Sequence, residues 1–234
     1  MEPKRIASEL EMFIRDFPAA FPVECSWSDS PTAFFYYIGK EAGFDIRCGD
    51  WAKRWKERVW KDQSQIIPER YRPHLEGRWP VKGLLAIDLC WVTAGFDNDN
   101  PPPDERKIIL AFEHEDETYN NSGTNLTAVL DEIRKIVNVK TIYKVLSFFT
   151  SKSESENGSN LPKIKAEIRR CPSREALTDT WIILQLCRYE TPKTKFREIK
   201  INSTPCLYIC CVGLSGNGAT EQLIGEATVP LPGR

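Results

Sequence analysis

The sequence has little histidine and no paired cysteines. Its two histidines are His74 and His114, and none of its eight cysteines belongs to a Cys-x-x-Cys pair. Structural zinc sites usually draw four ligands from closely spaced cysteines and histidines, so this composition argues against a zinc domain. Several cysteines lie in apolar runs such as "IDLCWV", where a free thiol behaves as a small hydrophobic side chain.

The chain also lacks an excess of either charge and a long apolar run. Its 32 basic and 33 acidic side chains leave a formal net charge of −1, which excludes a polycationic coat but permits a local basic groove. No apolar stretch approaches the length of a membrane span, and the start "MEPKRIASELEMF" is too charged for a signal peptide. We therefore expect a cytoplasmic protein that does not enter a membrane.

Several familiar catalytic motifs are missing. The stretch "GLSGNG" at 213–218 lacks the spacing of a dinucleotide-binding turn, and the sequence contains neither Gly-x-Ser-x-Gly nor His-Glu-x-x-His. A Rossmann dehydrogenase, a serine hydrolase of the nucleophile-elbow type and a zinc protease are thus disfavoured.

The length and composition predict one domain. A chain of 234 residues with 41% hydrophobic side chains can bury one sizeable core, so we expect a single domain over 1–234. We expect a helical N-terminal part over 1–80, a core sheet over 81–212 and a C-terminal tail over 213–234. Apolar spacing and capping signals place helices in that first part at 5–15, 30–43 and 50–63.

Strand and helix patterns alternate through the core. Short apolar runs rich in β-compatible residues predict strands at 84–92, 107–115, 141–149, 179–189, 195–201 and 205–213. The first two are expected to be antiparallel, and amphipathic patterns predict helices at 125–138 and 162–171. The fold class is therefore α/β (α+β), with a mixed sheet flanked by helices.

Acidic side chains occur where these strands should be buried. In "KIILAFEHE", residues 107–115, strand alternation places Glu113 and Glu115 on one face, and His114 on the other. Asp88 interrupts the preceding strand "LLAIDLCWV", where a carboxylate is costly unless it is paired or binds a metal. If the strands are neighbours, Asp88 approaches Glu113. Converging carboxylates repel one another, and a hard divalent cation such as Mg²⁺ resolves that conflict.

A purely structural interpretation is the alternative. Glu113 and Glu115 could mark a solvated strand end, and Asp88 could accept a hydrogen bond from a backbone amide. Each feature alone is explained in this way, whereas their combination on consecutive strands favours a metal site.

The arrangement resembles the PD-(D/E)xK restriction-endonuclease-like nucleases. Their core places an acid on one strand, Glu-x-Lys on the next, and then a helix and a further strand. Asp88 would be the first acid and Glu113-His114-Glu115 the second element, with 125–138 as the helix and 141–149 as the strand. The resemblance covers roughly residues 80–150 and implies a restriction-endonuclease-like mixed sheet.

The chain departs from this family at Glu115, where most members have lysine. A minority of restriction enzymes use Glu-x-Glu instead. A lysine from another element, Lys135 on the helix or Lys144 on the next strand, could stand in. Some members add an acid from an early helix, for which Glu41 and Glu69 are the candidates.

The resemblance implies a metal-dependent nuclease that hydrolyses phosphodiester bonds, in DNA rather than RNA. Asp88, Glu113 and the main-chain carbonyl of His114 would bind Mg²⁺, or Mn²⁺ in its place, and Glu115 would be a further ligand or would position the attacking water. The partner would be nucleic acid, and a homodimer is an open alternative to a monomer.

The segment "WAKRWKERVWK", residues 51–61, carries the first basic patch. Phosphate contacts are expected from Lys53, Arg54, Lys56 and Arg58. A solvated helix face is the alternative for this segment. For the whole chain, the alternatives are a non-catalytic binding or assembly subunit of the same fold, which the missing lysine favours, and an unrelated α/β interaction protein.

Overall fold

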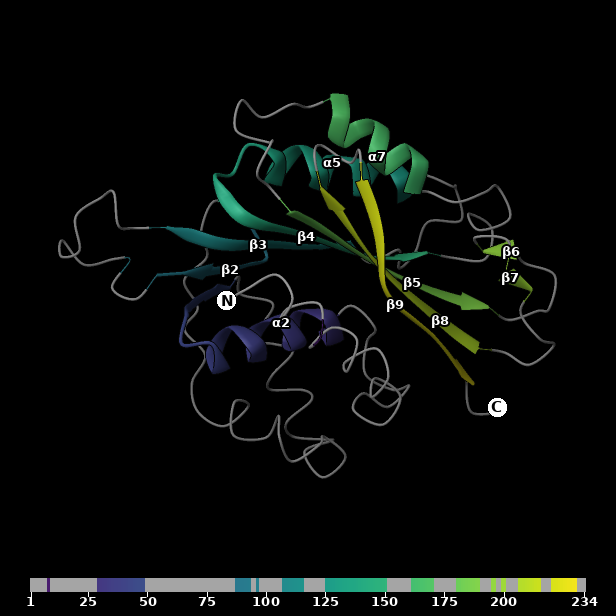
Figure 1. Cartoon of the computed structure of the whole chain (residues 1–234), viewed down its shortest axis with the longest axis horizontal. Coiled ribbons are helices and arrows are strands. Elements are labelled where there is room, and N and C mark those ends of the chain that lie inside the picture. Colours follow the sequence, from purple (N-terminus) through teal and green to yellow (C-terminus); the bar gives the residue numbers. More distant parts are fainter. Residues whose placement is uncertain are drawn as a thin grey trace.

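A mixed seven-stranded sheet forms the centre of the computed structural model (Figure 1). The structure describes residues 8, 29–48, 87–93, 96, 107–115, 125–150, 161–170, 180–189, 195–196, 199–200, 206–215 and 220–230. The strands of the sheet are β1 (Asp45–Cys48), β2 (Leu89–Val92), β3 (Ile108–Glu115), β4 (Thr141–Thr150), β5 (Thr180–Tyr189), β8 (Cys206–Ser215) and β9 (Thr220–Pro230). Their order across the sheet is β1-β2-β3-β4-β5-β8-β9.

Three helices accompany the sheet: α2 (Asp29–Glu41), α5 (Asn125–Val137) and α7 (Leu161–Arg170). Strands β2 and β3 are antiparallel, as expected from the sequence, whereas β3, β4 and β5 run parallel. Parallel neighbours need a crossover connection, and α5 and α7 lie within the two crossovers. Figure 1 shows α5 and α7 together on one face of the sheet and α2 on the other. The molecule is thus an α+β fold.

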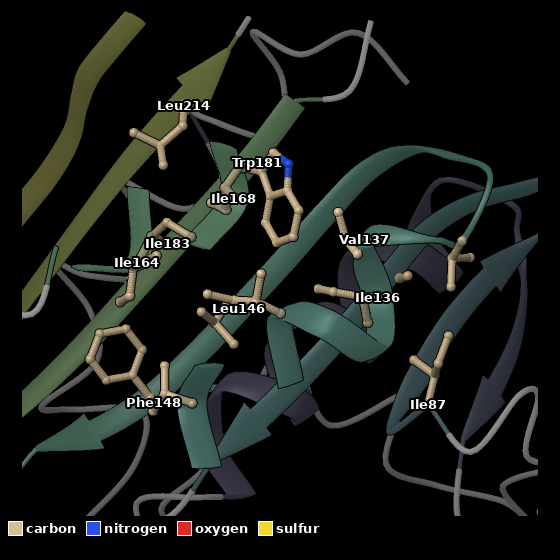
Figure 2. Packing of buried hydrophobic residues seen from close by; sticks show 14 of the residues in the cluster. Ile87, Ile136, Val137, Leu146, Phe148, Ile164, Ile168, Trp181, Ile183 and Leu214 are labelled. Carbon is tan, nitrogen blue, oxygen red and sulfur yellow. The ribbon is translucent and has the colours of Figure 1, made fainter. Parts of the chain in front are cut away.

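The main hydrophobic core lies between the sheet and the α5–α7 layer (Figure 2). Helix α5 contributes Ile133 and Ile136, and α7 contributes Ile164 and Ile168, so the buried positions recur at helical spacing. The facing strand positions supply side chains that include Leu146, Phe148, Trp181, Ile183 and Leu214. Because α5 is anchored along this apolar stripe, the polar residues at its edge are held in fixed positions over β3.

A second packed layer joins α2 to the opposite face of the sheet. The fully buried indole of Trp91 donates a hydrogen bond from Nε1 to the Phe35 carbonyl at 2.8 Å. Helix α2 is followed by Gly43, whose φ of 81° is accessible to glycine without strain. The Phe44 amide donates to the Gly39 carbonyl at 3.0 Å, which is the bond expected of a glycine-terminated helix.

The helices predicted at 30–43, 125–138 and 162–171 are confirmed by α2, α5 and α7 to within two residues. The strands predicted at 107–115, 141–149, 179–189 and 205–213 are likewise confirmed by β3, β4, β5 and β8, again to within two residues. The predicted helix at 50–63 lies outside the described residues, as does that at 5–15 apart from residue 8. No helix in the described part of the chain is long and apolar enough to cross a membrane.

Three expectations about the strands were wrong. Strand β1 lies inside the part expected to be helical. Its four residues are too few to show an alternating pattern, so it could not be predicted as a strand. Residues 195–201 contribute β6 (Lys195–Phe196) and β7 (Ile199–Lys200), a separate two-stranded sheet rather than a strand of the main one. The expected tail contains the end of β8 and all of β9, an edge strand of the sheet. An edge strand tolerates exposed polar residues, and Glu221 and Gln222 are exposed, so β9 lacks an apolar signature.

Replacement of Gly39 by alanine tests the packing of α2. A Cβ at this position would lie 2.6 Å from Ile46 Cδ1 and 2.7 Å from Trp91 Cδ1. Helix propensity alone would favour alanine by about 1 kcal/mol. We expect Gly39→Ala instead to lower the free energy of unfolding by about 1–3 kcal/mol, because buried Trp91 must move. Urea denaturation measures this change.

Gly213→Ala is the matched control. A Cβ there would approach Ile224 Cδ1 at 3.5 Å, an ordinary van der Waals contact, so we expect a change of less than about 1 kcal/mol. A stabilising Gly39→Ala substitution would contradict the described packing.

Candidate functional site

Glu113 is a carboxylic acid buried within the sheet. It belongs to β3, a strand covered on both faces, and its exposed fraction is 1%. Strand alternation puts Glu113 on the same face as Ala111, which belongs to the core beneath α5. Burial of an ionised carboxylate costs several kcal/mol unless partners compensate for the lost water. The partners of Glu113 therefore define the site.

Asp88 is the first partner and comes from the neighbouring strand. The β2–β3 register pairs Leu89 with Phe112, which brings the preceding Asp88 beside Glu113. The two carboxyl groups influence each other's pKa, and Asp88 Oδ2 accepts a hydrogen bond from the His114 amide at 2.9 Å. The structure thus brings together the two acids singled out in the sequence. Asp88 lies just before β2 rather than at the centre of the expected strand at 84–92.

Lys135 supplies the positive charge. Its Nζ lies 3.0 Å from Glu113 Oε1 and 2.5 Å from Glu132 Oε2, one turn earlier on α5. Of the two lysines proposed as stand-ins, Lys135 is therefore the one paired with Glu113. Lys144 is buried on β4, with its Nζ 5.9 Å from the centroid of the Trp181 ring.

Glu132 is a site residue that the sequence analysis did not identify. Its spacing of three residues from Lys135 places both side chains on one side of α5, where such pairs interact. That spacing was the available signal. The spacing alone could not identify Glu132, because the sequence does not show which edge of the helix faces β3.

Burial controls the protonation of the acids. Desolvation, followed by the charges of Asp88 and Glu132, raises the pKa of Glu113 to about 10. Desolvation is also the main reason that the pKa of Asp88 is raised. Both shifts favour the protonated form of this pair of carboxyl groups. Burial raises the pKa of the nearby Cys90 thiol to about 12, and the charges of Glu113 and Asp88 add to that increase.

Lys135 remains a cation in these surroundings. Desolvation lowers its pKa, but hydrogen bonds and charge interactions with Glu132 and Glu113 more than offset this, so the pKa is raised. Full ionisation of the three acids and Lys135 would leave the cluster with a formal charge of −2. The cluster thus retains an unbalanced negative charge, which either a proton or a metal ion can reduce.

The two residues that follow Glu113 have different positions. His114 directs its ring to the α2 face, where Nδ1 lies 3.0 Å from Ser147 Oγ, and burial lowers its pKa to about 3. Its side chain is therefore not part of the acidic cluster, as alternation predicted. Glu115 is half-buried and, by alternation, shares the face of Glu113. The main-chain carbonyl of His114 stays a predicted ligand.

Among the remaining predicted residues, the described Glu41 does not join this cluster. Glu41 is exposed at the end of α2, on the other side of the sheet. The other early acid, Glu69, and the four basic residues Lys53, Arg54, Lys56 and Arg58 lie outside the described residues. Within the part that the structure describes, no three His, Cys, Asp or Glu side chains are arranged to hold a metal ion.

Comparisons with protein-family models, curated proteins and solved structures find no match to this chain. The interpretation of the site consequently depends on its own geometry and chemistry.

The raised pKa of Glu113 predicts a pH-dependent stability. A carboxyl group whose pKa is higher in the folded state stabilises the fold below its unfolded pKa of 4.5, and that contribution is lost as pH rises toward 10. Glu113→Gln removes this titration. We expect the free energy of unfolding of wild type to fall relative to Glu113→Gln by about 1–3 kcal/mol between pH 6 and pH 8.

Chemical denaturation over this pH range measures the difference. Asp45→Asn, a substitution of a partly exposed acid on β1, is the control, and its difference from wild type should be the same at pH 6 and pH 8. A difference between wild type and Glu113→Gln that does not vary with pH would disprove the assigned protonation.

Proposed function

We propose that this protein is a metal-dependent nuclease that hydrolyses phosphodiester bonds in DNA. The observation that carries the proposal is the meeting of buried Glu113 with Asp88 and with the ammonium group of Lys135. Two acids and a lysine at one strand end are the groups that hydrolysis of a phosphodiester requires, because they can hold a cation, orient water and neutralise phosphate charge.

The order of elements around the acids supports the same function. An acid precedes β2, a second acid lies on β3, and α5 leads to β4, which is parallel to β3. This is the order in which restriction-endonuclease-like nucleases carry their site, and we propose that the mixed sheet has that fold. Sites grafted on a shared fold can differ in chemistry, so the side chains carry more weight than the order.

Lys135 would replace the lysine that the nuclease pattern has at the position of Glu115. The nuclease pattern calls for lysine two residues after the second acid, and this chain has glutamate there. Lys135 brings an ammonium group to within 3.0 Å of the carboxylate of Glu113 from the helix instead. With 36% of its side chain exposed, it can contact both the buried acid and a substrate at the surface.

The chemistry of the donors fits Mg²⁺, with Mn²⁺ as a substitute. Asp88 and Glu113 offer hard carboxylate oxygens, and the cluster keeps a negative charge after pairing with Lys135. We propose these two side chains and the main-chain carbonyl of His114 as ligands. A bound Mg²⁺ would lower the pKa of a coordinated water and stabilise charge on the phosphate.

The protein groups have separate roles in this proposal. The His114 amide fixes Asp88 through the 2.9 Å hydrogen bond, so this carboxylate needs no rearrangement before it binds a cation. Lys135 would donate hydrogen bonds to a non-bridging phosphate oxygen and offset its charge. Glu115, half-buried on the same face, would accept a hydrogen bond from the attacking water and orient it.

The partner and location follow from this function. Nucleic acid is the proposed partner, and homodimerisation remains an open alternative. We place the protein in the cytoplasm. The free, buried thiol of Cys90 supports a reducing compartment.

A non-catalytic protein of the same fold is the second candidate. The specific observation in its favour is that the ammonium group of Lys135 lies 3.0 Å from Glu113 Oε1 and already compensates the carboxylate charge. Such a protein would keep the acids as a satisfied polar cluster and would bind nucleic acid without cleaving it.

A cleavage assay separates the two candidates. Purified protein is incubated with supercoiled plasmid and with single-stranded DNA in Mg²⁺ or Mn²⁺. We expect cleavage by wild type and a loss of at least about 100-fold in Asp88→Asn and Glu113→Gln, because each removes a metal ligand. Lys135→Met should lose about 100-fold as well, since it removes charge stabilisation worth about 3 kcal/mol.

Asp45→Asn is the matched control, since it neutralises an acid on the edge strand β1, at the end of that strand away from Asp88. Its activity should equal that of wild type. Cleavage that persists unchanged in Asp88→Asn and Glu113→Gln would assign the activity elsewhere, and a complete lack of cleavage would favour the non-catalytic candidate.

A further inference from the structure

Helices α5 and α7 present a group of exposed basic side chains beside the acidic cluster. Lys163, Arg169 and Arg170 are exposed on α7, and Arg134 is exposed on α5. We call these four residues the basic ridge. They contrast with the whole chain, whose formal net charge is −1.

A buried acid holds two of the guanidinium groups in place. Glu167 is 7% exposed, and its Oε1 accepts hydrogen bonds from Arg134 Nε and Arg170 Nη2, each at 2.6 Å. The side chains of Arg134 and Arg170 remain 42% and 66% exposed. Glu167 is therefore buried, whereas the guanidinium groups of Arg134 and Arg170 are exposed to solvent. A guanidinium fixed in this way loses little entropy when it binds a phosphate.

Helix stability does not explain the whole ridge. Arg169 and Arg170 lie in the last turn of α7, where positive charge interacts favourably with the helix dipole. Lys163 lies in the first turn, where the same dipole disfavours a cation, and this turn contains no acid. The helix dipole therefore does not account for the positive charge at Lys163.

Acids on α5 and β9 pair with basic side chains in this region. Asp131 is bonded to Arg134 at 2.5 Å, and Glu221 of β9 is bonded at 3.0 Å to Lys165, a basic residue of α7 outside the ridge.

We propose that the basic ridge binds the phosphate backbone of nucleic acid beyond the scissile bond. This inference rests on the proposed function. Arg134 of the ridge and Lys135 of the acidic cluster are consecutive residues of α5, so the ridge adjoins the proposed site. Packed helices lie about 8–10 Å apart, and one strand of B-DNA advances about 3.4 Å per phosphate. The ridge on α7 therefore meets phosphates about three nucleotides from those at Lys135. Base edges are not contacted, so the ridge adds affinity without sequence preference.

The test measures binding in the absence of cleavage. A fluorescent 20-base-pair DNA duplex is titrated with protein in EDTA, and anisotropy is recorded from 50 to 200 mM salt. We expect Lys163→Gln/Arg169→Gln to weaken binding about tenfold at 100 mM salt. The slope of log K against log salt should fall by about 1.8, since each lost phosphate contact contributes about 0.9. Lys163→Gln alone should lower the slope by about 0.9.

The matched control is Lys107→Gln/Lys140→Gln. Both lysines are exposed and lie just before β3 and β4, at the strand ends opposite Glu113. This control should bind within twofold of wild type. Thermal melting verifies that all variants fold. Duplex RNA and single-stranded DNA are titrated in parallel to identify which backbone is preferred.

Equal weakening in both double variants, unchanged binding in the ridge variants, or no binding of any nucleic acid by wild type would overturn the inference. A protein that binds through the ridge but cuts no DNA in Mg²⁺ would contradict the proposed nuclease and leave the ridge assignment intact. If the wild type cuts DNA and the ridge variants bind DNA as well as wild type, the ridge assignment is contradicted and the proposed nuclease is left intact.

Discussion

The burial of Glu113 inside the sheet is the constraint on which the rest of the site depends. A carboxylate on a strand covered on both faces loses its water, and this loss favours the protonated form. The fold responds with Asp88 on one side and Lys135 on the other. The three groups compensate one another only in part, and the cluster keeps a negative charge in an apolar region. In the proposed function, that residual charge would attract a cation.

Helix α5 connects this chemistry to the stability of the fold. Its apolar side packs Ile133 and Ile136 into the main core, which fixes the rotation of the helix about its axis. With that rotation fixed, Lys135 reaches Glu113, and Arg134 reaches Glu167 of α7. Consecutive residues of one helix thus belong to the acidic cluster and to the basic ridge. An anionic strand that binds the ridge would be led along α5 toward the acids.

Part of the site was predictable from sequence because strands alternate with a period of two. That rule places Glu113 on the α5 face and the His114 ring on the other, and the antiparallel pairing of β2 and β3 brings Asp88 to Glu113. The rule does not extend to α5. The choice between Lys135 and Lys144, and the presence of Glu132, depend on how the helix is rotated over the sheet, which three-dimensional packing decides.

The fold, like the site, was predictable from the sequence only in part. Long periodic elements such as β3, β4 and α5 were predictable because core burial imposes their pattern. Strand β1 is too short to show a period, and β9 is an edge strand whose outer positions are polar. Neither is marked by the apolar alternation on which the prediction relied. The pairing of β9 with β8 is a property of the assembled sheet, not of the local sequence.

Binding of Mn²⁺ to the ¹⁵N-labelled protein, followed by NMR, tests the central claim most directly. A paramagnetic ion held between Asp88 and Glu113 should broaden the amide signals of Leu89, Glu113 and His114 at substoichiometric concentration, and should leave those of β9 sharp. The same titration of Asp88→Asn/Glu113→Gln should show no such broadening. Unbroadened signals in wild type at millimolar Mn²⁺, or equal broadening in the double variant, would contradict the account.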